Sequence, residues 1–322
     1  MMYDVVALGE YLIDFLPAGR SEAGQPLFER NPGGAPVNVL AALAKLEKKT
    51  AFIGKVGKDP FGEYLRDVLL EQGIDASGLV FAPRAHTTMA FVQLDEQGER
   101  SFHFCRQPGA DQELSGEEID KRLLEKTAIF HFGSISMTAD PSYTATLQAV
   151  RHAKASGAVI SYDPNLRPAL WEDEAHARRT IEEGFLYADL VKISQEELLF
   201  LSGTGDLEAG SKQLAERFPA LKLLLVTLGS EGTFYYRGTG ASGHVPAFEV
   251  RTVDTTGAGD GFFGAFLYRA AESGKALEAW EKPELEEAVA FANAAGALAT
   301  TRKGAIPSMA TKEEITRLME GI

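Results

Sequence analysis

The segment Asp254–Asp260, which reads Asp-Thr-Thr-Gly-Ala-Gly-Asp, contains the residues of this sequence best suited to chemistry. Gly257, Ala258 and Gly259 are small, so ligand atoms can approach their backbone, and an apolar pattern typical of a helix follows them. N–H groups at a helix N-terminus bind anions. Beside them, the carboxylate of Asp260 can accept the proton of an attacking hydroxyl during phosphoryl transfer. The alternative is a glycine-rich turn with an aspartate cap.

A second segment, Asn-Pro-Gly-Gly-Ala-Pro-Val-Asn over residues 31–38, also combines small and polar residues. Gly33 and Gly34 permit positive φ and close backbone approach, and Pro36 suits the first turn of a helix. Asn38 falls in that first turn, where its amide can face a ligand above the glycine pair. Such donor and acceptor groups suit a neutral polyol. An ordinary turn that leads into a helix is the alternative.

Other patterns are weaker. Residues 238–243 match G-x-G-x-x-G, but the strand-like segment HVPAFEV follows them, so they lack the helix that a dinucleotide site requires. The sequence has no G-x-x-x-x-G-K-[ST] loop, which disfavours a Walker-type NTPase. The six histidines show no metal-ligand spacing, and Cys105 is interpreted as a small packing residue.

Composition bounds the function classes. The 322 residues are 45% hydrophobic and 24% charged, which are globular values. The net charge of −14 argues against a broad nucleic-acid or membrane-surface binder, yet it leaves room for one small anion in a local pocket. A single cysteine precludes an internal disulfide, and no apolar run has the length of a membrane helix. The expected location is the cytoplasm.

The elements that must position these residues alternate between short apolar strands and helical patterns. Strands are expected at residues 3–9, 50–56, 127–133, 158–163, 189–193, 221–228 and 244–250. Helices are expected to begin at Pro60, to span residues 141–156, and to follow a capping box formed by Ser115 and Glu118. Apolar strands that alternate with helices predict a largely parallel sheet covered on both faces.

Two stretches break this alternation. Residues 10–33 and 86–112 contain no helical pattern, and the second includes two alternating strands around an Asp-Glu-Gln-Gly turn at residues 95–98, which indicates a β-hairpin. We expect these stretches to form a discontinuous β-lid, and residues 1–9, 34–85 and 113–322 to form the α/β core. An ordinary surface insertion is the alternative. An exposed β-layer also favours a homodimer joined through the lids.

Together, these residues resemble the ribokinase-like (phosphofructokinase-B) carbohydrate kinases, and most of all the fructokinases among them. Gly9-Glu10 with Asp14 is similar to the opening strand and sugar-binding aspartate of that family. Residues 33–38, followed by Gly54–Asp59, resemble its first signature, and residues 254–260 resemble its second. The resemblance runs nearly end to end. It implies an α/β three-layer sandwich with a mostly parallel central sheet and a small β-sheet lid.

The resemblance also implies roles for residues around the sugar. Asp260 corresponds to the catalytic base, and Gly257, Ala258 and Gly259 correspond to the anion hole for the γ-phosphate. The implied sugar-binding positions are Asp14, Gly33, Gly34, Asn38, Phe104, Arg106 and Arg167.

Further roles concern the nucleotide and its ions. The nucleotide positions implied by the resemblance are Ser194, Thr227, Gly229, Gly232 and Asn293. Glu197 corresponds to a magnesium-linked residue that acts through water, because Mg²⁺ dehydrates reluctantly. Ser194 departs from the family, in which Asn is commoner at this position. Asp254, Thr256, Gly304 and Ser308 resemble a loop that binds a monovalent cation, expected to be K⁺.

The function implied is ATP-dependent, magnesium-dependent phosphorylation of a hexose, D-fructose, at O6. A rival acceptor is 2-keto-3-deoxygluconate, since Arg106 and Arg167 can clamp a carboxylate. Another kind of alternative is a catalytically silent kinase-like binding protein, which the intact Gly-Ala-Gly-Asp segment argues against. A nicotinamide dehydrogenase is disfavoured by the missing dinucleotide fingerprint.

Overall fold

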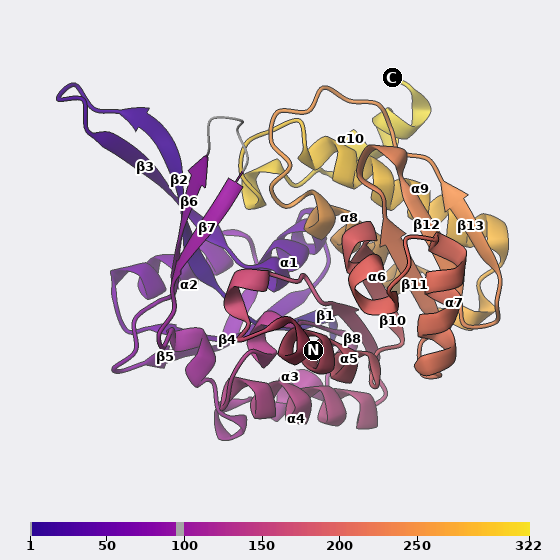
Figure 1. The fold of residues 1–322 in the computed structure, drawn as a ribbon, viewed down its shortest axis with the longest axis horizontal. Helices are drawn as coiled ribbons and strands as arrows, with labels where there is room; N and C mark the ends of the chain where they lie inside the picture. Colours follow the sequence, from indigo (N-terminus) through magenta and orange to yellow (C-terminus); the bar gives the residue numbers. More distant parts are fainter. Residues whose placement is uncertain (1, 95–99) are drawn as a thin grey trace.

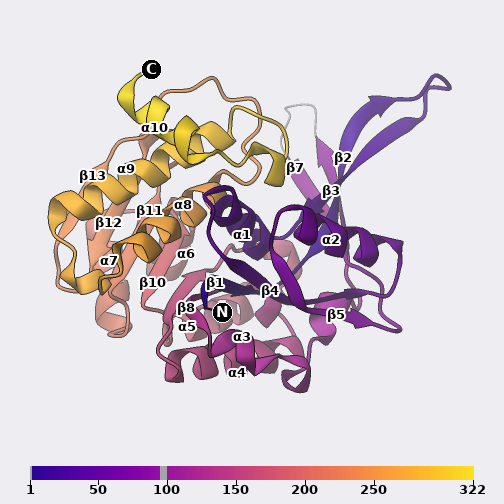
Figure 2. The ribbon, with the colours of Figure 1, turned by 180° about the vertical axis from the view of Figure 1, so that it is seen from behind.

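The structure, a computed structural model, describes residues 2–94 and 100–322. It contains a nine-stranded sheet in the order β13-β12-β11-β10-β9-β8-β1-β4-β5 and a four-stranded sheet in the order β3-β2-β6-β7. Helices flank the large sheet, and the small sheet projects from one end of it (Figures 1 and 2). The predicted α/β class, with a large mostly parallel sheet and a second smaller one, is confirmed.

The strands are β1 (Tyr3–Leu8), β2 (Leu12–Arg20), β3 (Pro26–Gly33), β4 (Thr50–Gly57), β5 (Asp75–Ala82), β6 (Met89–Leu94), β7 (Arg100–Cys105), β8 (Thr127–Gly133), β9 (Val159–Asp163), β10 (Leu190–Ser194), β11 (Leu223–Thr227), β12 (Thr233–Arg237) and β13 (Ser242–Val245). The helices are α1 (Ala35–Lys45), α2 (Pro60–Glu71), α3 (Lys121–Leu124), α4 (Ser142–Ala155), α5 (Glu174–Phe185), α6 (Gln195–Ser202), α7 (Leu207–Arg217), α8 (Ala258–Ser273), α9 (Lys282–Ala299) and α10 (Lys312–Glu320). Short 3₁₀ turns connect several of them.

The large sheet is parallel from β11 to β5, and β12 and β13 extend it in antiparallel pairing at one edge. Its central strands are apolar because helices cover both faces; every residue of β4 is buried, for example. Because these strands are parallel, the carboxyl ends of β1, β9, β10 and β11 all point the same way. Ligands bind beyond the carboxyl ends of the strands in open α/β folds.

Two apolar cores lie on the two faces of this sheet. One core joins it to α1, α2, α8, α9 and α10, and the other joins it to α3, α4, α5, α6 and α7. Successive side chains of a strand point to opposite faces, so Leu190 of β10 enters the first core while Val191 and Ile193 enter the second. This alternation sets which strand side chains face α8.

The small sheet is built from the two stretches expected to form a lid. β2 and β3 pair antiparallel, β6 and β7 pair antiparallel, and β2 pairs parallel with β6. The hairpin of β2 and β3 reaches farthest from the core (Figure 1). The turn expected at residues 95–98 lies outside the described residues, and the division into two domains stays a prediction.

Two expected elements differ in the structure. The strand expected at residues 244–250 is wrong in its bounds: β13 ends at Val245, because Pro246 has no N–H to continue the ladder. The capping box of Ser115 and Glu118 is present, but it begins a single 3₁₀ turn. The helix that follows, α3, is only four residues long and has its own cap, Asp120.

The remaining expected helices are present. α2 begins at Pro60 with Asp59 as its N-cap, and α4 covers residues 142–155. Among the described residues, no helix is both long enough and apolar enough to cross a membrane. The expected cytoplasmic location remains a prediction.

Candidate active site

The glycine-rich segment forms the N-terminus of α8. Gly257 is the N-cap residue with φ of +77°, a conformation that favours glycine, and a Cβ there would lie 2.7 Å from the Cβ of Ala305. The N–H of Ala258 donates to the carbonyl of Thr255 at 3.2 Å. The N–H groups of the next residues, including Gly259, begin the helix and have no intrahelical acceptor. The helix therefore presents an anion-binding end at this edge of the sheet.

Asp260 lies in the first turn of α8 and is held by α1. The amide nitrogen of Asn38 donates to Oδ2 of Asp260 at 2.8 Å. The pKa of Asp260 is raised to about 6, mainly by burial and also by Asp163, while Lys192, Asn38 and Arg167 act in the opposite direction. Asp260 is thus a carboxylate with a raised pKa beside the anion-binding end of α8. Such a group is suited to act as a general base.

Asn38 is oriented by the glycine pair before α1. Gly34 has φ of +130°, and a Cβ there would lie 2.4 Å from the carbonyl oxygen of Glu10, so only glycine fits. Asn38 is 6% exposed, and its Oδ1 has no hydrogen-bond partner among the described residues. A buried acceptor of this kind can accept a hydrogen bond from a ligand hydroxyl.

Asp14 approaches the same place from β2, and Arg167 approaches it from the segment after β9. A Cβ on Gly33 would lie 2.1 Å from Oδ2 of Asp14, so the glycine makes room for this carboxylate. Burial raises the pKa of Asp14 to about 6, and Arg167 lowers it. Asp14 also lines a small cleft with Thr256 and Gly304. The structure therefore brings Asp14, Arg167, Asn38 and Asp260 toward one site.

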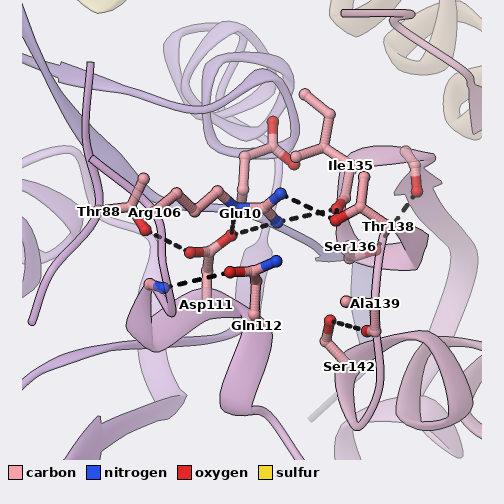
Figure 3. Close-up of polar contacts among 12 residues, drawn as sticks. Glu10, Thr88, Arg106, Asp111, Gln112, Ile135, Ser136, Thr138, Ala139 and Ser142 are labelled. Atoms are coloured by element: carbon pink, nitrogen blue, oxygen red, sulfur yellow. Dashed lines mark hydrogen bonds and ion pairs between the residues drawn. The ribbon is translucent and has the colours of Figure 1, made fainter. Parts of the chain in front are cut away.

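Arg106 lies at the root of the lid and is engaged on three sides (Figure 3). It follows β7 directly and is 6% exposed. Its Nε donates to Oδ2 of Asp111 at 2.8 Å, its Nη1 to Oγ1 of Thr138 at 2.8 Å, and its Nη2 to the Ile135 carbonyl at 2.9 Å. Thr88 donates to the other carboxylate oxygen of Asp111. Arg106 thus joins the lid to the core, and its role in binding sugar stays a prediction.

Besides Asp111, Glu10 is an acidic group where the small sheet joins the core. It follows β1, is 2% exposed, and accepts a 2.9 Å hydrogen bond from the N–H of Ala35. Its second carboxylate oxygen has no partner among the described residues, and burial raises its pKa to about 7. Phe104, also predicted to surround the sugar, lies partly buried in β7 opposite Ala90.

Ser194 and Glu197 form a reciprocal capping box at the start of α6. The N–H of Ser194 donates to Oε2 of Glu197 at 2.8 Å, and the N–H of Glu197 donates to Oγ of Ser194 at 3.2 Å. Oε1 of Glu197 accepts from the N–H of Leu166 at 2.7 Å. Both carboxylate oxygens thus have backbone partners, and burial raises the pKa of Glu197.

The residues predicted to bind the nucleotide lie around the end of β11. Thr227 pairs with Ser194 across the two strands, and Gly229 starts the 3₁₀ turn that follows β11. Gly232 closes that turn with φ of +103°, and a Cβ there would lie 2.2 Å from the carbonyl oxygen of Val245. Asn293 of α9 is 6% exposed, accepts from Thr233, and donates to the Val245 carbonyl at 3.0 Å. Asn293 thereby anchors this region.

The residues expected to bind a monovalent cation connect the segment before α8 with the segment after α9. Oδ1 of Asp254 accepts from the N–H and hydroxyl of Thr256, and its Oδ2 accepts from the N–H of Gly304 at 3.0 Å. Ser308 is fully buried and donates to the Ala305 carbonyl at 2.7 Å. In residues 2–94 and 100–322, no group of three His, Cys, Asp or Glu side chains could hold a metal ion.

Sequence reasoning missed a buried ion pair beneath the site. Nζ of Lys192 in β10 lies 2.8 Å from Oδ2 of Asp163 at the end of β9. His131 of β8 lies nearby, and burial lowers its pKa to about 4, so it is neutral at physiological pH. A lysine in the middle of an apolar strand was the available signal, since such a residue needs a buried partner.

The comparisons agree with this geometry. The model of the pfkB carbohydrate kinase family matches residues 2–312. Fructokinase-1 of Oryza sativa subsp. japonica is 48% identical over 318 residues, which cover 98% of this chain and 97% of that protein. The chain belongs to the pfkB family of carbohydrate kinases.

Solved structures of fructokinases share the fold. The Xylella fastidiosa fructokinase with bound ATP superposes with a TM-score of 0.92 at 36% identity, over 99% of each chain. The Vibrio cholerae O395 fructokinase, in a form that binds fructose, ADP and a calcium ion, gives a TM-score of 0.88 at 35% identity, over 98% of this chain and 99% of that one. The predicted ribokinase-like family is therefore confirmed.

Proposed function

We propose that this protein is an ATP-dependent kinase that phosphorylates D-fructose at O6. The observation that carries the proposal is the placement of Asp260: its carboxylate lies in the first turn of α8, where the helix binds anions, and Asn38 holds it at 2.8 Å. Asp260 removes the proton of the sugar hydroxyl while N–H groups at the start of α8, that of Gly259 among them, bind the transferring phosphoryl group.

The sugar side of the site comes from the core and the lid together. Asn38 offers a buried, unpartnered amide oxygen, and Asp14 offers a carboxylate from β2. Groups of this kind recognise hydroxyls by hydrogen bonds, and a closed lid excludes water that would otherwise hydrolyse ATP. The names of the similar proteins, fructokinases from a plant and two bacteria, support fructose as the acceptor.

ATP and a divalent cation complete the proposal. The ATP of the Xylella protein, and the ADP and calcium ion of the Vibrio protein, support a nucleotide and a divalent ion here. Mg²⁺ neutralises phosphate charge and keeps several of its waters. Both oxygens of Glu197 already accept backbone N–H groups, so Glu197 would hold the ion through those waters.

The geometry disfavours 2-keto-3-deoxygluconate as the acceptor. A two-arginine clamp on its carboxylate would require Arg106, whose guanidinium is engaged with Asp111, Thr138 and Ile135. Of these two arginines, Arg167 is the one left to meet a negative charge. The kcat/KM values for fructose and for 2-keto-3-deoxygluconate, measured side by side, test the choice, and ³¹P NMR of the product checks transfer to O6. A preference for the acid would overturn the assignment of fructose.

A monovalent cation, K⁺, is part of the proposal. Asp254 accepts hydrogen bonds from Thr256 and from Gly304, so it holds these two loops together beside α8. Oxygen atoms of these loops are hard ligands, which suit a cation such as K⁺. Replacing KCl by tetramethylammonium chloride at equal ionic strength should lower kcat. Equal rates in both salts would remove the cation from the proposal.

We also propose a homodimer joined through the lids. Leu27 and Phe28 of β3 are 45% and 44% exposed, and Phe28 lies edge-on to Phe91, which stacks on Phe15. A second copy can cover this apolar surface. Light scattering at micromolar concentration should give twice the chain mass for the wild type and the chain mass for Phe28→Glu. A monomeric wild type contradicts the dimer.

A further inference from the structure

Lys192 and Asp163 form an ion pair in the buried interior of the large sheet, where charged residues are uncommon. Lys192 is 7% exposed in the middle of β10, between Val191 and Ile193, and Asp163 is 1% exposed at the end of β9. Nζ of Lys192 lies 2.8 Å from Oδ2 of Asp163. A buried pair of this kind loses hydration that its mutual attraction only partly offsets. Its presence therefore calls for a role besides stability.

The ammonium group reaches the first turn of α8. Lys192 shares a face of β10 with Leu190, which packs into the core formed with α8. A Cβ on Gly259 would lie only 3.1 Å from Nζ of Lys192. The glycine thus leaves room for the ammonium beside the backbone that we propose binds the transferring phosphoryl group.

Lys192 is surrounded by carboxylates near the start of α8. Lys192 experiences the negative charges of Asp163, Glu197 and Asp260. Without Lys192, these three carboxylates would have one cation fewer to offset them near the place where a phosphoryl group must arrive, although Arg167 also acts on Asp260. Burial opposes the charge of Lys192, but Asp163 and Glu197 outweigh it and raise the Lys192 pKa, so the side chain is an ammonium at neutral pH.

We propose that Lys192, held in place by Asp163, is a positioning residue of the phosphoryl-transfer centre, where its ammonium adds positive charge beside the start of α8 and offsets the surrounding carboxylates. This inference rests on the proposed kinase function. It assigns Asp163 the task of fixing the lysine, and Gly259 the task of admitting it.

Lys192 and Asp163 also influence the pKa of Asp260. The groups that face Asp260 are Asn38 from α1, Asp163 and Arg167 from β9 and the segment after it, and Lys192 from β10. Lys192 lowers the pKa of Asp260 and Asp163 raises it. Loss of the lysine charge should therefore move the acid limb of the kcat/KM profile to higher pH.

The test compares Lys192→Met with a matched variant, Lys55→Met. Lys55 is also 7% exposed in a strand of the same sheet, and its Nζ pairs with Glu118 at 2.7 Å, away from α8. Lys192→Met should lower kcat on the order of 10²-fold, with KM for fructose changed only a few-fold, and should shift the acid limb upward. Lys55→Met should lower the Tm but leave kcat and the acid limb at wild-type values.

The outcomes separate this inference from the proposed function. A wild type without sugar-dependent ADP release contradicts the proposed function itself. An active wild type with a folded Lys192→Met of equal kcat and pH profile contradicts only the role of Lys192, as does an equal loss in Lys55→Met. If Lys192→Met does not fold, Asp163→Asn decides, because it keeps the lysine and removes the charge that holds it: a lowered kcat with KM for fructose changed only a few-fold supports the inference, and a wild-type kcat overturns it.

Discussion

The side-chain amide of Asn38, in the first turn of α1, donates a 2.8 Å hydrogen bond to Oδ2 of Asp260, in the first turn of α8, across 222 residues of sequence. This bond joins the glycine pair at the lid root to the glycine-rich turn at the anion site. It fixes the direction of the Asp260 carboxylate and leaves the amide oxygen of Asn38 free for a ligand hydroxyl. The proposed sugar site and the proposed phosphate site therefore share one hydrogen bond.

Changes at Asn38 should shift the pH dependence of turnover. The Asn38 hydrogen bond lowers the pKa of Asp260, which burial has raised to about 6. Asn38→Ala removes this bond, so kcat should fall and the acid limb of the kcat/KM profile should move to higher pH. Asn38→Asp adds a negative charge and should move the limb farther upward. A limb that stays at the wild-type position in both variants would disprove the coupling.

Asp260→Asn should stabilise the fold at alkaline pH. The native pKa of Asp260, about 6, is above the ordinary value of 3.8, so the native state keeps a proton that the unfolded state has already lost. The free energy of unfolding therefore falls as pH rises between these values, and the loss is complete above pH 6. In urea titrations, Asp260→Asn should exceed the wild type at pH 8 and approach it near pH 4. A variant less stable than the wild type at pH 8 contradicts this sign.

Glu10→Gln should flatten the pH dependence of stability at the lid root. Burial raises the pKa of Glu10 from 4.5 to about 7, so its ionisation lowers the free energy of unfolding as pH rises through that window. Glutamine keeps an acceptor for the Ala35 N–H and carries no charge. Urea titrations from pH 5 to pH 8 should show a growing advantage of the variant over the wild type. A constant difference across that range would mean that Glu10 is not responsible.

Breaking the Arg106–Asp111 pair should destabilise the joint between lid and core. Their side chains are 4% and 1% exposed, and removing either partner leaves a buried charge, which costs about 3–5 kcal/mol. The double variant Arg106→Met, Asp111→Leu should recover much of this loss in the free energy of unfolding. Additive losses in a double-mutant cycle would show that the two charges do not depend on each other.

Local patterns in the sequence predicted much of the fold. Apolar runs such as residues 127–133 and the cap at Asp59 and Pro60 identified their elements because helices and strands are set by nearby residues. The strand expected to extend to residue 250 was wrong because Pro246 ends the ladder. Pro246 was the available signal, because a proline cannot donate to the ladder, and the alternating pattern around it concealed it.

The site was less predictable where partners are distant in sequence. Gly257 and Asp260 are neighbours along the chain, and their position at the start of α8 follows from local spacing. Arg106 is engaged by Thr138 and Ile135, and Lys192 by Asp163, through contacts that only the tertiary fold creates. The sequence does not reveal these partners of Arg106, whose role in binding sugar stays a prediction, and it shows Lys192 only as part of a strand.

The most direct test of the proposed function is ADP release coupled to a panel of sugars, with the wild type and Asp260→Asn compared in the presence of ATP and Mg²⁺. We predict ADP release that depends on the sugar, with the highest kcat/KM for D-fructose. Asp260→Asn should lose about 10²–10⁴-fold in kcat while its Kd for ADP stays within a few-fold of the wild type. No sugar-dependent ADP release from the wild type, or turnover of Asp260→Asn within a few-fold of it, would contradict the proposed function or the role of its base.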